Sequence, residues 1–319
     1  MSVPSRDLAG LQQTVWQGSI PLEIRLASSE CRTYDNSDPY LIQAPRLSYL
    51  PFLLPRLHAF FESSLIDPNI HPSRGWFSFE EIPLKWHHPL GLLYDLYSGV
   101  SPAFFPSDEP TPTPPIPPWR LVLHFTDWPP QLVPLDPEYK ALHDSFVNTV
   151  KEADFLRNGT AKAVMSLSKE SSTQLWRAVE AQDLEMFNPI YQRLVSPQGG
   201  AGLRHLPMKV YLPSTPDVAA PGEEGEAIQE GSTPGLQVGS MRTVVALVTP
   251  MYSSRQPQTL GTALNAMLPT VFQSRRTPLL AVPVLHGAVV PLSAVVEDLV
   301  KAAAYADGFL HVVVSMLGE

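Results

Sequence analysis

The chain has 319 residues, of which 44% are hydrophobic, and it carries a formal net charge of −9. This length and hydrophobic content predict a globular protein of about two to three domains. The acidic charge argues against an extended nucleic-acid surface, because phosphate contact requires clustered Lys and Arg. We therefore expect no nucleic acid among its partners, and at most a local basic patch that contacts acidic lipid.

Cysteine content and hydropathy bear on the compartment. The single cysteine, Cys31, cannot form an intramolecular disulfide, and no basic segment followed by an apolar one opens the chain. The most apolar long stretch, 279–296, contains Pro283, Gly287 and Pro291, which argue against a membrane-spanning helix. We expect a cytoplasmic protein whose membrane contact, if it has any, is peripheral.

The first 128 residues follow the order strand, strand, helix, strand, helix, strand. The expected strands are 14–26, 40–50, 75–87 and 119–126, and the expected helices are 52–65 and 89–98. This ββαβαβ order is that of a ubiquitin-like β-grasp, in which helix covers one face of a small mixed sheet. The segment 101–118 contains eight prolines and is expected to be an exposed insert within this domain.

The segment PLKWHHPLGLLYDL (83–96) predicts a strand that passes directly into a helix. Leu84 and Trp86 alternate with polar neighbours at strand period, and Pro89 takes the first helical position. His87 and His88 would then point to opposite faces of the strand, so they are badly placed to share a metal ion. A structural junction is favoured over a ligand site, and no metal is expected.

From residue 137 to 195 the hydrophobic pattern becomes helical. One apolar stripe contains Tyr139, Leu142, Phe146, Val150 and Ala153. Asn158-Gly159 should end this helix. Shorter helices are expected at 174–181 and 184–195, the second capped by Asp183 and kinked or shortened by Pro189.

The β-type order returns after residue 200. Strands are expected at 204–212, 242–249, 279–286 and 309–316, and helices at 259–268 and 291–305. The segment 213–235 is rich in Pro, Gly and Glu and is expected to be a disordered insert. The predicted fold is therefore α+β, with two ubiquitin-like β-grasp domains (1–128 and 201–319) flanking a helix-rich domain (129–200).

Seven segments resemble the autophagy protein 5 family in order and spacing, and in particular its members from filamentous fungi. They are PLKWHHPLGLLYDL (83–96), VWQGSIPLEIRL (15–26), YLIQAPRLSYLPFLLPRL (40–57), WRLVLHF (119–125), VKEADFL (150–156), QLWRAVE (174–180) and RHLPMKVYL (204–212). The resemblance covers nearly the whole chain and is weakest in the last third.

The resemblance implies that Lys151, within VKEADFL, accepts the C-terminal glycine of the ubiquitin-like autophagy protein 12 through an isopeptide bond. At 100° per residue Lys151 lies roughly 140° from the centre of the apolar stripe, beside Asp144 and Asn148 on the solvated face. Glu152 and Asp154 should favour the charged ammonium, so the conjugating enzyme must assist its deprotonation.

The family further implies partners and a location. The conjugate would bind a helix of the coiled-coil autophagy protein 16 in a groove, and would meet the activating and conjugating enzymes of the pathway. The assembly would act like a ligase that promotes lipidation of autophagy protein 8 with phosphatidylethanolamine. This chain would supply neither a catalytic residue nor a cofactor, and would lie peripherally at the membrane of the preautophagosomal structure.

Two other functions are weighed against conjugation. The chain could be an unmodified β-grasp adaptor that binds partner helices. It could also be a transfer enzyme that uses Cys31, but Cys31 lies in a polar segment beside Glu30, which should raise the pKa of the thiol. We also find no phosphate loop, dinucleotide fingerprint or nucleophile elbow.

Several exposed-looking residues leave alternatives open. Phe155 lies one turn beyond Lys151 and is expected to contact another helix, although it could dock the modifier. Lys162 and Lys169 are expected on an ordinary solvated face, although they could face acidic lipid. Phe104 and Phe105 in the proline-rich insert could form a short docking anchor.

Overall fold

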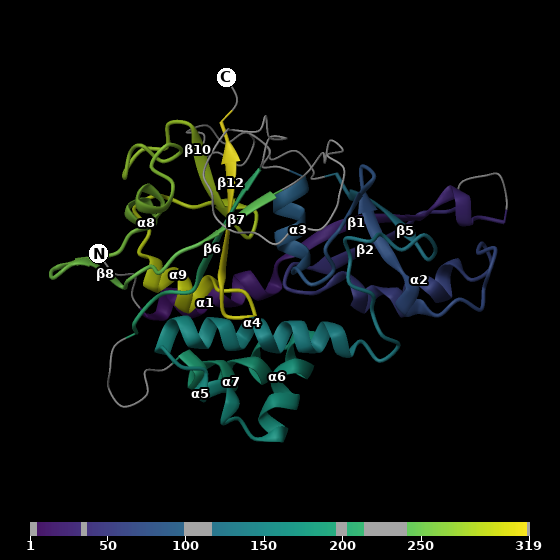
Figure 1. Cartoon of the computed structure of the whole chain (residues 1–319), viewed down its shortest axis with the longest axis horizontal. Coiled ribbons are helices and arrows are strands. Elements are labelled where there is room, and N and C mark those ends of the chain that lie inside the picture. The colour runs from purple at the N-terminus through teal and green to yellow at the C-terminus, as the bar shows by residue number, and fades with distance from the viewer. Residues whose placement is uncertain (1–4, 33–36, 99–116, 196–202, 214–240, 318–319) are drawn as a thin grey trace, which may run out of the picture.

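The computed structural model describes residues 5–32, 37–98, 117–195, 203–213 and 241–317. Two five-stranded sheets with their own helices stand side by side above a layer of further helices (Figure 1). The architecture is α+β, as predicted. The predictions for the inserts 101–118 and 213–235, including Phe104 and Phe105, fall almost entirely outside the described residues.

The first sheet has the strand order β2-β1-β5-β3-β4, in which β1 pairs parallel with β5 and the other pairs are antiparallel. Its strands are β1 (Ser19–Leu26), β2 (Tyr40–Pro45), β3 (Trp76–Phe79), β4 (Ile82–Pro83) and β5 (Trp119–His124). Alternate residues of β1, from Ile20 to Leu26, are buried. They pack with α2 (Leu54–Phe61) and α3 (Leu90–Tyr97) in the hydrophobic core.

The expected strand 14–26 is wrong in its first part. Residues Ser5–Gln17 form the helix α1, and the strand begins at Ser19. Helix α1 lies between α9 (Val296–Ala303), which accompanies the second sheet, and the helical layer. Because the segment is helical, the neighbouring residues Val15 and Trp16 are both buried there. The Trp16 ring centroid lies 4.6 Å from that of Phe187 in the helical layer.

The expected strand 75–87 is instead a tight hairpin of β3 and β4 followed by a turn. The burial alternation still holds, since Leu84 and Trp86 are buried, and the Trp86 indole N–H donates to the carbonyl of Val133 at 2.7 Å. Because residues 86–88 turn, His87 and His88 do not face opposite sides, and their ring centroids are 4.4 Å apart.

The helical layer contains one long and three shorter helices. They are α4 (Lys140–Asn158), α5 (Lys162–Met165), α6 (Lys169–Ala181) and α7 (Leu184–Val195). The predicted stripe from Leu142 to Ala153 is buried, and Gly159 ends α4 with a φ of 74°. Asp183 caps α7 by accepting the Met186 N–H at 2.9 Å, while Pro189 lies within the helix.

The second sheet repeats the first. Its order is β7-β6-β12-β10-β11, with β6 parallel to β12 at the centre. Its strands are β6 (Met208–Pro213), β7 (Met241–Val245), β10 (Ala281–Leu285), β11 (Ala288–Val289) and β12 (Leu310–Met316). The helices α8 (Leu260–Met267) and α9 accompany it, and a small hairpin pairs β8 (Met251–Ser253) with β9 (Gln256–Pro257).

No helix within the described ranges is long and apolar enough to cross a membrane. The predicted repetition of the ββαβαβ order is confirmed at the level of strand pairing. The expected helix 291–305 is shorter, since α9 covers only Val296–Ala303.

Candidate functional site

Lys151 lies on α4, and its side chain is half-buried. Asp144 and Asn148, two turns and one turn before it, are exposed. Among the described residues, none forms an ion pair or a hydrogen bond with the Lys151 ammonium. The amine therefore stands on a long helix, with no competing partner in the part of the chain that the structure describes.

The carboxylates expected around Lys151 are engaged elsewhere. Glu152 forms an ion pair with Lys209 of β6 at 2.8 Å. Asp154 is fully buried and accepts the Asn158 side-chain N–H at 2.7 Å and the Val164 backbone N–H at 3.1 Å. Both carboxylates therefore help to fix α4 to its neighbours, and the expectation that they favour the charged form of Lys151 stays a prediction.

Phe155 is 57% exposed, although we expected it to contact another helix. The apolar stripe of α4 faces the core, and Phe155 lies outside that stripe. An exposed aromatic ring therefore stands one turn from Lys151. Lys162 and Lys169 are both exposed, and their contact with lipid stays a prediction.

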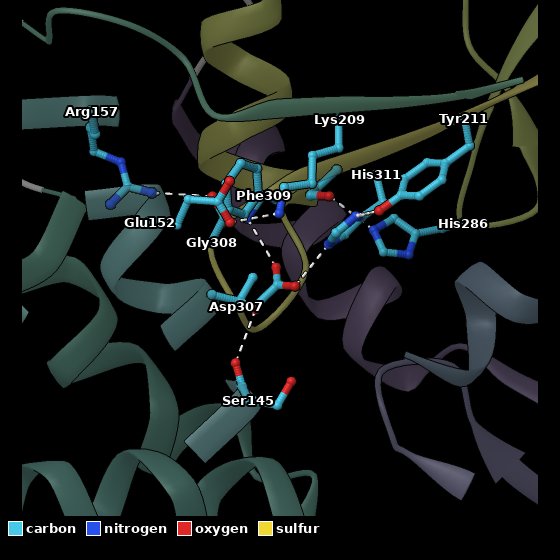
Figure 2. A network of polar contacts seen from close by, with 12 residues as sticks. Ser145, Glu152, Arg157, Lys209, Tyr211, His286, Asp307, Gly308, Phe309 and His311 are labelled. Atoms are coloured by element: carbon cyan, nitrogen blue, oxygen red, sulfur yellow. Dashed lines mark hydrogen bonds and ion pairs between the residues drawn. The ribbon is translucent and has the colours of Figure 1, made fainter. Parts of the chain in front are cut away.

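Polar contacts around the loop that precedes β12 connect helix α4 to the second sheet (Figure 2). The Arg157 guanidinium donates to the Gly308 carbonyl at 3.2 Å. The Lys209 ammonium lies 4.1 Å from the ring centroid of Phe309 while it pairs with Glu152. These contacts join α4, which carries Lys151, to the second β-grasp unit.

A buried acid and histidine order the same loop (Figure 2). Asp307 accepts the Phe309 backbone N–H at 3.0 Å and contacts the His311 Nε2 at 2.8 Å. Tyr211 completes the chain, since its hydroxyl lies 2.8 Å from the His311 Nδ1. Burial alone would raise the pKa of Asp307, but His311 and the Phe309 N–H together hold it below its ordinary value.

The two β-grasp units meet at a second buried polar junction. Arg46, which follows β2, forms an ion pair with Asp95 of α3 and donates to the Gly91 carbonyl at 3.2 Å. The other oxygen of Asp95 accepts the backbone N–H of Gly287 in the β10–β11 turn, at 2.9 Å. Both charged side chains are buried, so this junction links the two sheets through one carboxylate.

Sequence reasoning did not find this junction. Arg46 and Gly287 carry no local motif, and Gly287 is far from Asp95 along the chain. The available signal was Asp95 itself, a charged residue within the apolar stripe of Leu92, Leu93 and Leu96. A buried acid in such a stripe requires a partner.

Cys31 is buried, although it lies in a polar segment. Its backbone bridges to Leu65, and its Sγ lies 3.5 Å from the Ala27 carbonyl oxygen. The Glu30 carboxylate accepts the backbone N–H groups of Phe125 and Thr126. Within the described ranges, no group of three or more His, Cys, Asp or Glu side chains could hold a metal ion.

Comparison with known proteins gives matches along nearly the whole chain. Three family models match in order: the UblA domain of autophagy protein ATG5 at residues 15–125, its alpha-helical bundle region at 139–197 and its UblB domain at 205–314. Autophagy protein 5 of Phaeosphaeria nodorum is 55% identical over 318 residues, covering 97% of each chain. Autophagy protein 5 of Penicillium rubens is 51% identical, covering 98% of each.

A solved structure agrees in fold. The crystal structure of Kluyveromyces marxianus Atg5 superposes with a TM-score of 0.70 at 19% identity, covering 95% of this chain and 98% of the other. At this identity the similarity concerns the fold alone.

Proposed function

Because the chain belongs to the autophagy protein 5 family, we propose that it is joined through Lys151 to the ubiquitin-like autophagy protein 12. The observation that carries the proposal is the state of Lys151. Its amine has no ion-pair partner among the described residues, and it stands on a helix fixed by Glu152 and Arg157. A nucleophile so placed can enter the active site of a conjugating enzyme without disturbing the fold.

The conjugate is then a non-catalytic subunit. It binds a helix of autophagy protein 16, and the assembly acts like a ligase that promotes lipidation of autophagy protein 8 with phosphatidylethanolamine. Its location is peripheral, at the preautophagosomal structure. The domain boundaries 1–128, 129–200 and 201–319 belong to the same proposal, in which two β-grasp units present surfaces around a helical centre.

The decisive experiment is reconstitution with the activating and conjugating enzymes. Lys151→Arg should abolish the adduct with autophagy protein 12 while leaving the melting temperature unchanged, because guanidinium keeps the charge but cannot act as the amine nucleophile. Lys140→Arg at the start of the same helix is the matched control and should conjugate like the wild type.

Mass spectrometry of the branched peptide separates the alternatives. A peptide that maps to Lys140 or Lys162 would overturn the assignment of Lys151. The absence of any adduct would favour an unmodified adaptor that binds helices. A reductant-labile adduct at Cys31 would indicate a transfer enzyme, which would require the buried thiol to become exposed.

A further inference from the structure

The chain just before β10 is exposed over six consecutive residues, 275–280. This stretch contains neither helix nor strand, and it carries the dipeptide Thr277-Pro278. The Ser274 hydroxyl oxygen shapes its turn by accepting the backbone N–H groups of Arg276 at 3.3 Å and Thr277 at 3.1 Å. Among the described residues, none forms a hydrogen bond with the Thr277 hydroxyl. An exposed threonine with an unpaired hydroxyl therefore stands on an irregular loop.

The other Ser/Thr-Pro dipeptide within the described ranges, Thr249-Pro250, has different surroundings. The Thr249 hydroxyl donates to the Met251 carbonyl at 2.8 Å. Val248, the preceding residue, forms an isolated β-bridge, and β8 begins at Met251. The chain on both sides of Thr249 is therefore paired, whereas the loop of Thr277 can enter the cleft of an enzyme without breaking a strand.

Arg275 links this loop to the β8–β9 hairpin, which projects at the left edge of the molecule (Figure 1). Its Nη1 donates to the Tyr252 hydroxyl at 2.7 Å, and the guanidinium carbon lies 5.4 Å from the Tyr252 ring centroid. Its Nε donates to the Asn265 side-chain oxygen at 2.9 Å. All three contacts are with neutral groups, so a phosphate within reach would form stronger, charge-assisted bonds with the same guanidinium.

The charges around the loop favour a phosphate. Residues 241–296 contain four arginines and no Asp or Glu, in a chain whose net charge is −9. Two of these arginines, Arg275 and Arg276, directly precede Thr277. A phosphate beside acidic groups is repelled, whereas a phosphate beside arginines orders the segment that carries it. An added negative charge is therefore stabilised at this position.

We propose that Thr277 is phosphorylated by a proline-directed protein kinase, and that the phosphate binds Arg275 in place of Tyr252, which frees the β8–β9 hairpin from the loop. The site is separate from the conjugation proposed at Lys151. A proline directly after the acceptor has no N–H to donate, so a kinase that requires a hydrogen bond from that position is excluded.

The transfer itself needs ATP and the kinase. The Thr277 hydroxyl oxygen forms a bond to the γ-phosphorus of ATP, the bond from that phosphorus to the β-phosphate oxygen breaks, and ADP leaves. The hydroxyl proton passes to the catalytic aspartate of the kinase.

The first test incubates the full chain with ATP and a mitogen-activated protein kinase, followed by phosphopeptide mapping. We expect phosphate at Thr277 at a rate about tenfold above that at Thr249, because Thr249 must first break its local pairing. Thr277→Val should remove this phosphate and leave the melting temperature unchanged, since the side chain is exposed. Equal rates at the two threonines would show that the loop does not select the site.

A synthetic peptide of residues 271–284 separates the local sequence from its presentation. A phosphorylated peptide together with an unmodified Thr277 in the folded chain would overturn the proposal, because the loop would then be inaccessible to the enzyme. Failure of the kinase to modify either one would overturn the assignment to a proline-directed kinase.

Hydrogen exchange tests the release of the hairpin. Full phosphorylation, checked by mass spectrometry, should increase the exchange rate of the amides in residues 251–256 severalfold. In Arg275→Gln the link is already lost, so phosphorylation should add nothing. Arg276→Gln is the matched control and should respond like the wild type. Unchanged exchange in the phosphorylated wild-type chain would overturn the proposed release.

Discussion

The two β-grasp sheets share one strand order, yet the tight hairpin at the same place in each has different surroundings. In the first sheet the turn between β3 and β4 consists of Glu80 and Glu81, with φ values of 47° and 67°, and both residues are exposed. In the second sheet the turn between β10 and β11 consists of His286 and Gly287, with φ values of 52° and 80°. This turn is packed against the first domain.

The backbone is thus the same in both turns, and the side chains decide its use. Gly287 donates to Asp95, and His286 donates from Nε2 to the Ala303 carbonyl at 2.9 Å while stacking on Tyr305 at 4.2 Å. A glycine permits the close approach of Arg46 at this point. The same hairpin turn is therefore exposed in the first domain, whereas in the second domain it joins the two domains.

The largest expected effect comes from breaking the joint at its carboxylate. Asp95→Asn leaves the buried Arg46 guanidinium without its counter-charge, so we expect a loss of about 3 to 5 kcal/mol in the free energy of unfolding. Urea denaturation measures it, and Glu81→Gln in the exposed turn is the control. A loss below about 1 kcal/mol would mean that the junction does not hold the two domains together.

Gly287→Ala tests the approach of Arg46. A Cβ atom at this position would lie 3.0 Å from the Arg46 Nη1, and the φ of 80° disfavours any side chain. We expect a loss of about 2 to 3 kcal/mol from strain and overpacking. The same urea experiment measures the loss. A variant as stable as the wild type would show that a Cβ atom at position 287 is accommodated beside Arg46 without cost.

The pH dependence of stability tests His286. Burial lowers the pKa of His286 from 6.5 to about 3, and the Arg46 and His311 charges act in the same direction. The unfolded chain therefore binds more protons between these values, so stability is complete above pH 6.5 and falls as the pH decreases toward 3. The loss from this group between pH 7 and pH 5 is about 2 kcal/mol.

His286→Asn removes this titration and keeps a residue that tolerates a positive φ. The difference between the two profiles of stability against pH isolates His286. If both profiles have the same slope from pH 7 to pH 5, the ring is not buried as a neutral group.

The smallest effect is a gain in the exposed turn. Two glutamates at positive φ are unfavourable, whereas Asn followed by Gly suits this type of hairpin. Glu80→Asn combined with Glu81→Gly should stabilise the protein by about 1 kcal/mol. Thermal melting checks it, and a decrease in stability would show that the glutamates make contacts that offset their backbone strain.

Local patterns predicted the order of elements well, and they failed where tertiary contacts decide. The stripe from Leu142 to Val150 and the end of α4 at Gly159 followed from period and turn chemistry. The alternation around Trp86 correctly predicted that Leu84 and Trp86 are buried. The backbone there is a turn, however, and not the expected strand. Helix α1 was missed because its helical state depends on α7 and α9, which are distant in sequence.

The candidate site was predictable only in part. Lys151 was selected by resemblance, and its solvated helix face by periodicity. The ion pair of Glu152 with Lys209 requires β6 to lie beside α4, which no spacing along the chain reveals. The same holds for the 57% exposure of Phe155, which is decided by the packing of the neighbouring helices and not by spacing along the chain.

The parallel pair at the centre of each sheet has a consequence for synthesis on the ribosome. Leu22 pairs with Trp119, and Met208 pairs with Leu310, so neither sheet can close until its final strand has emerged. At about 5 to 20 residues per second, translation of the chain between β5 and β12 takes about 10 to 40 seconds, so the first sheet can close well before the second. During that interval Arg46 and Asp95 can pair with each other, but the backbone N–H of Gly287 in the second domain is not yet available to Asp95. A chaperone that meets the nascent chain would find at this place a polar surface that the finished protein buries.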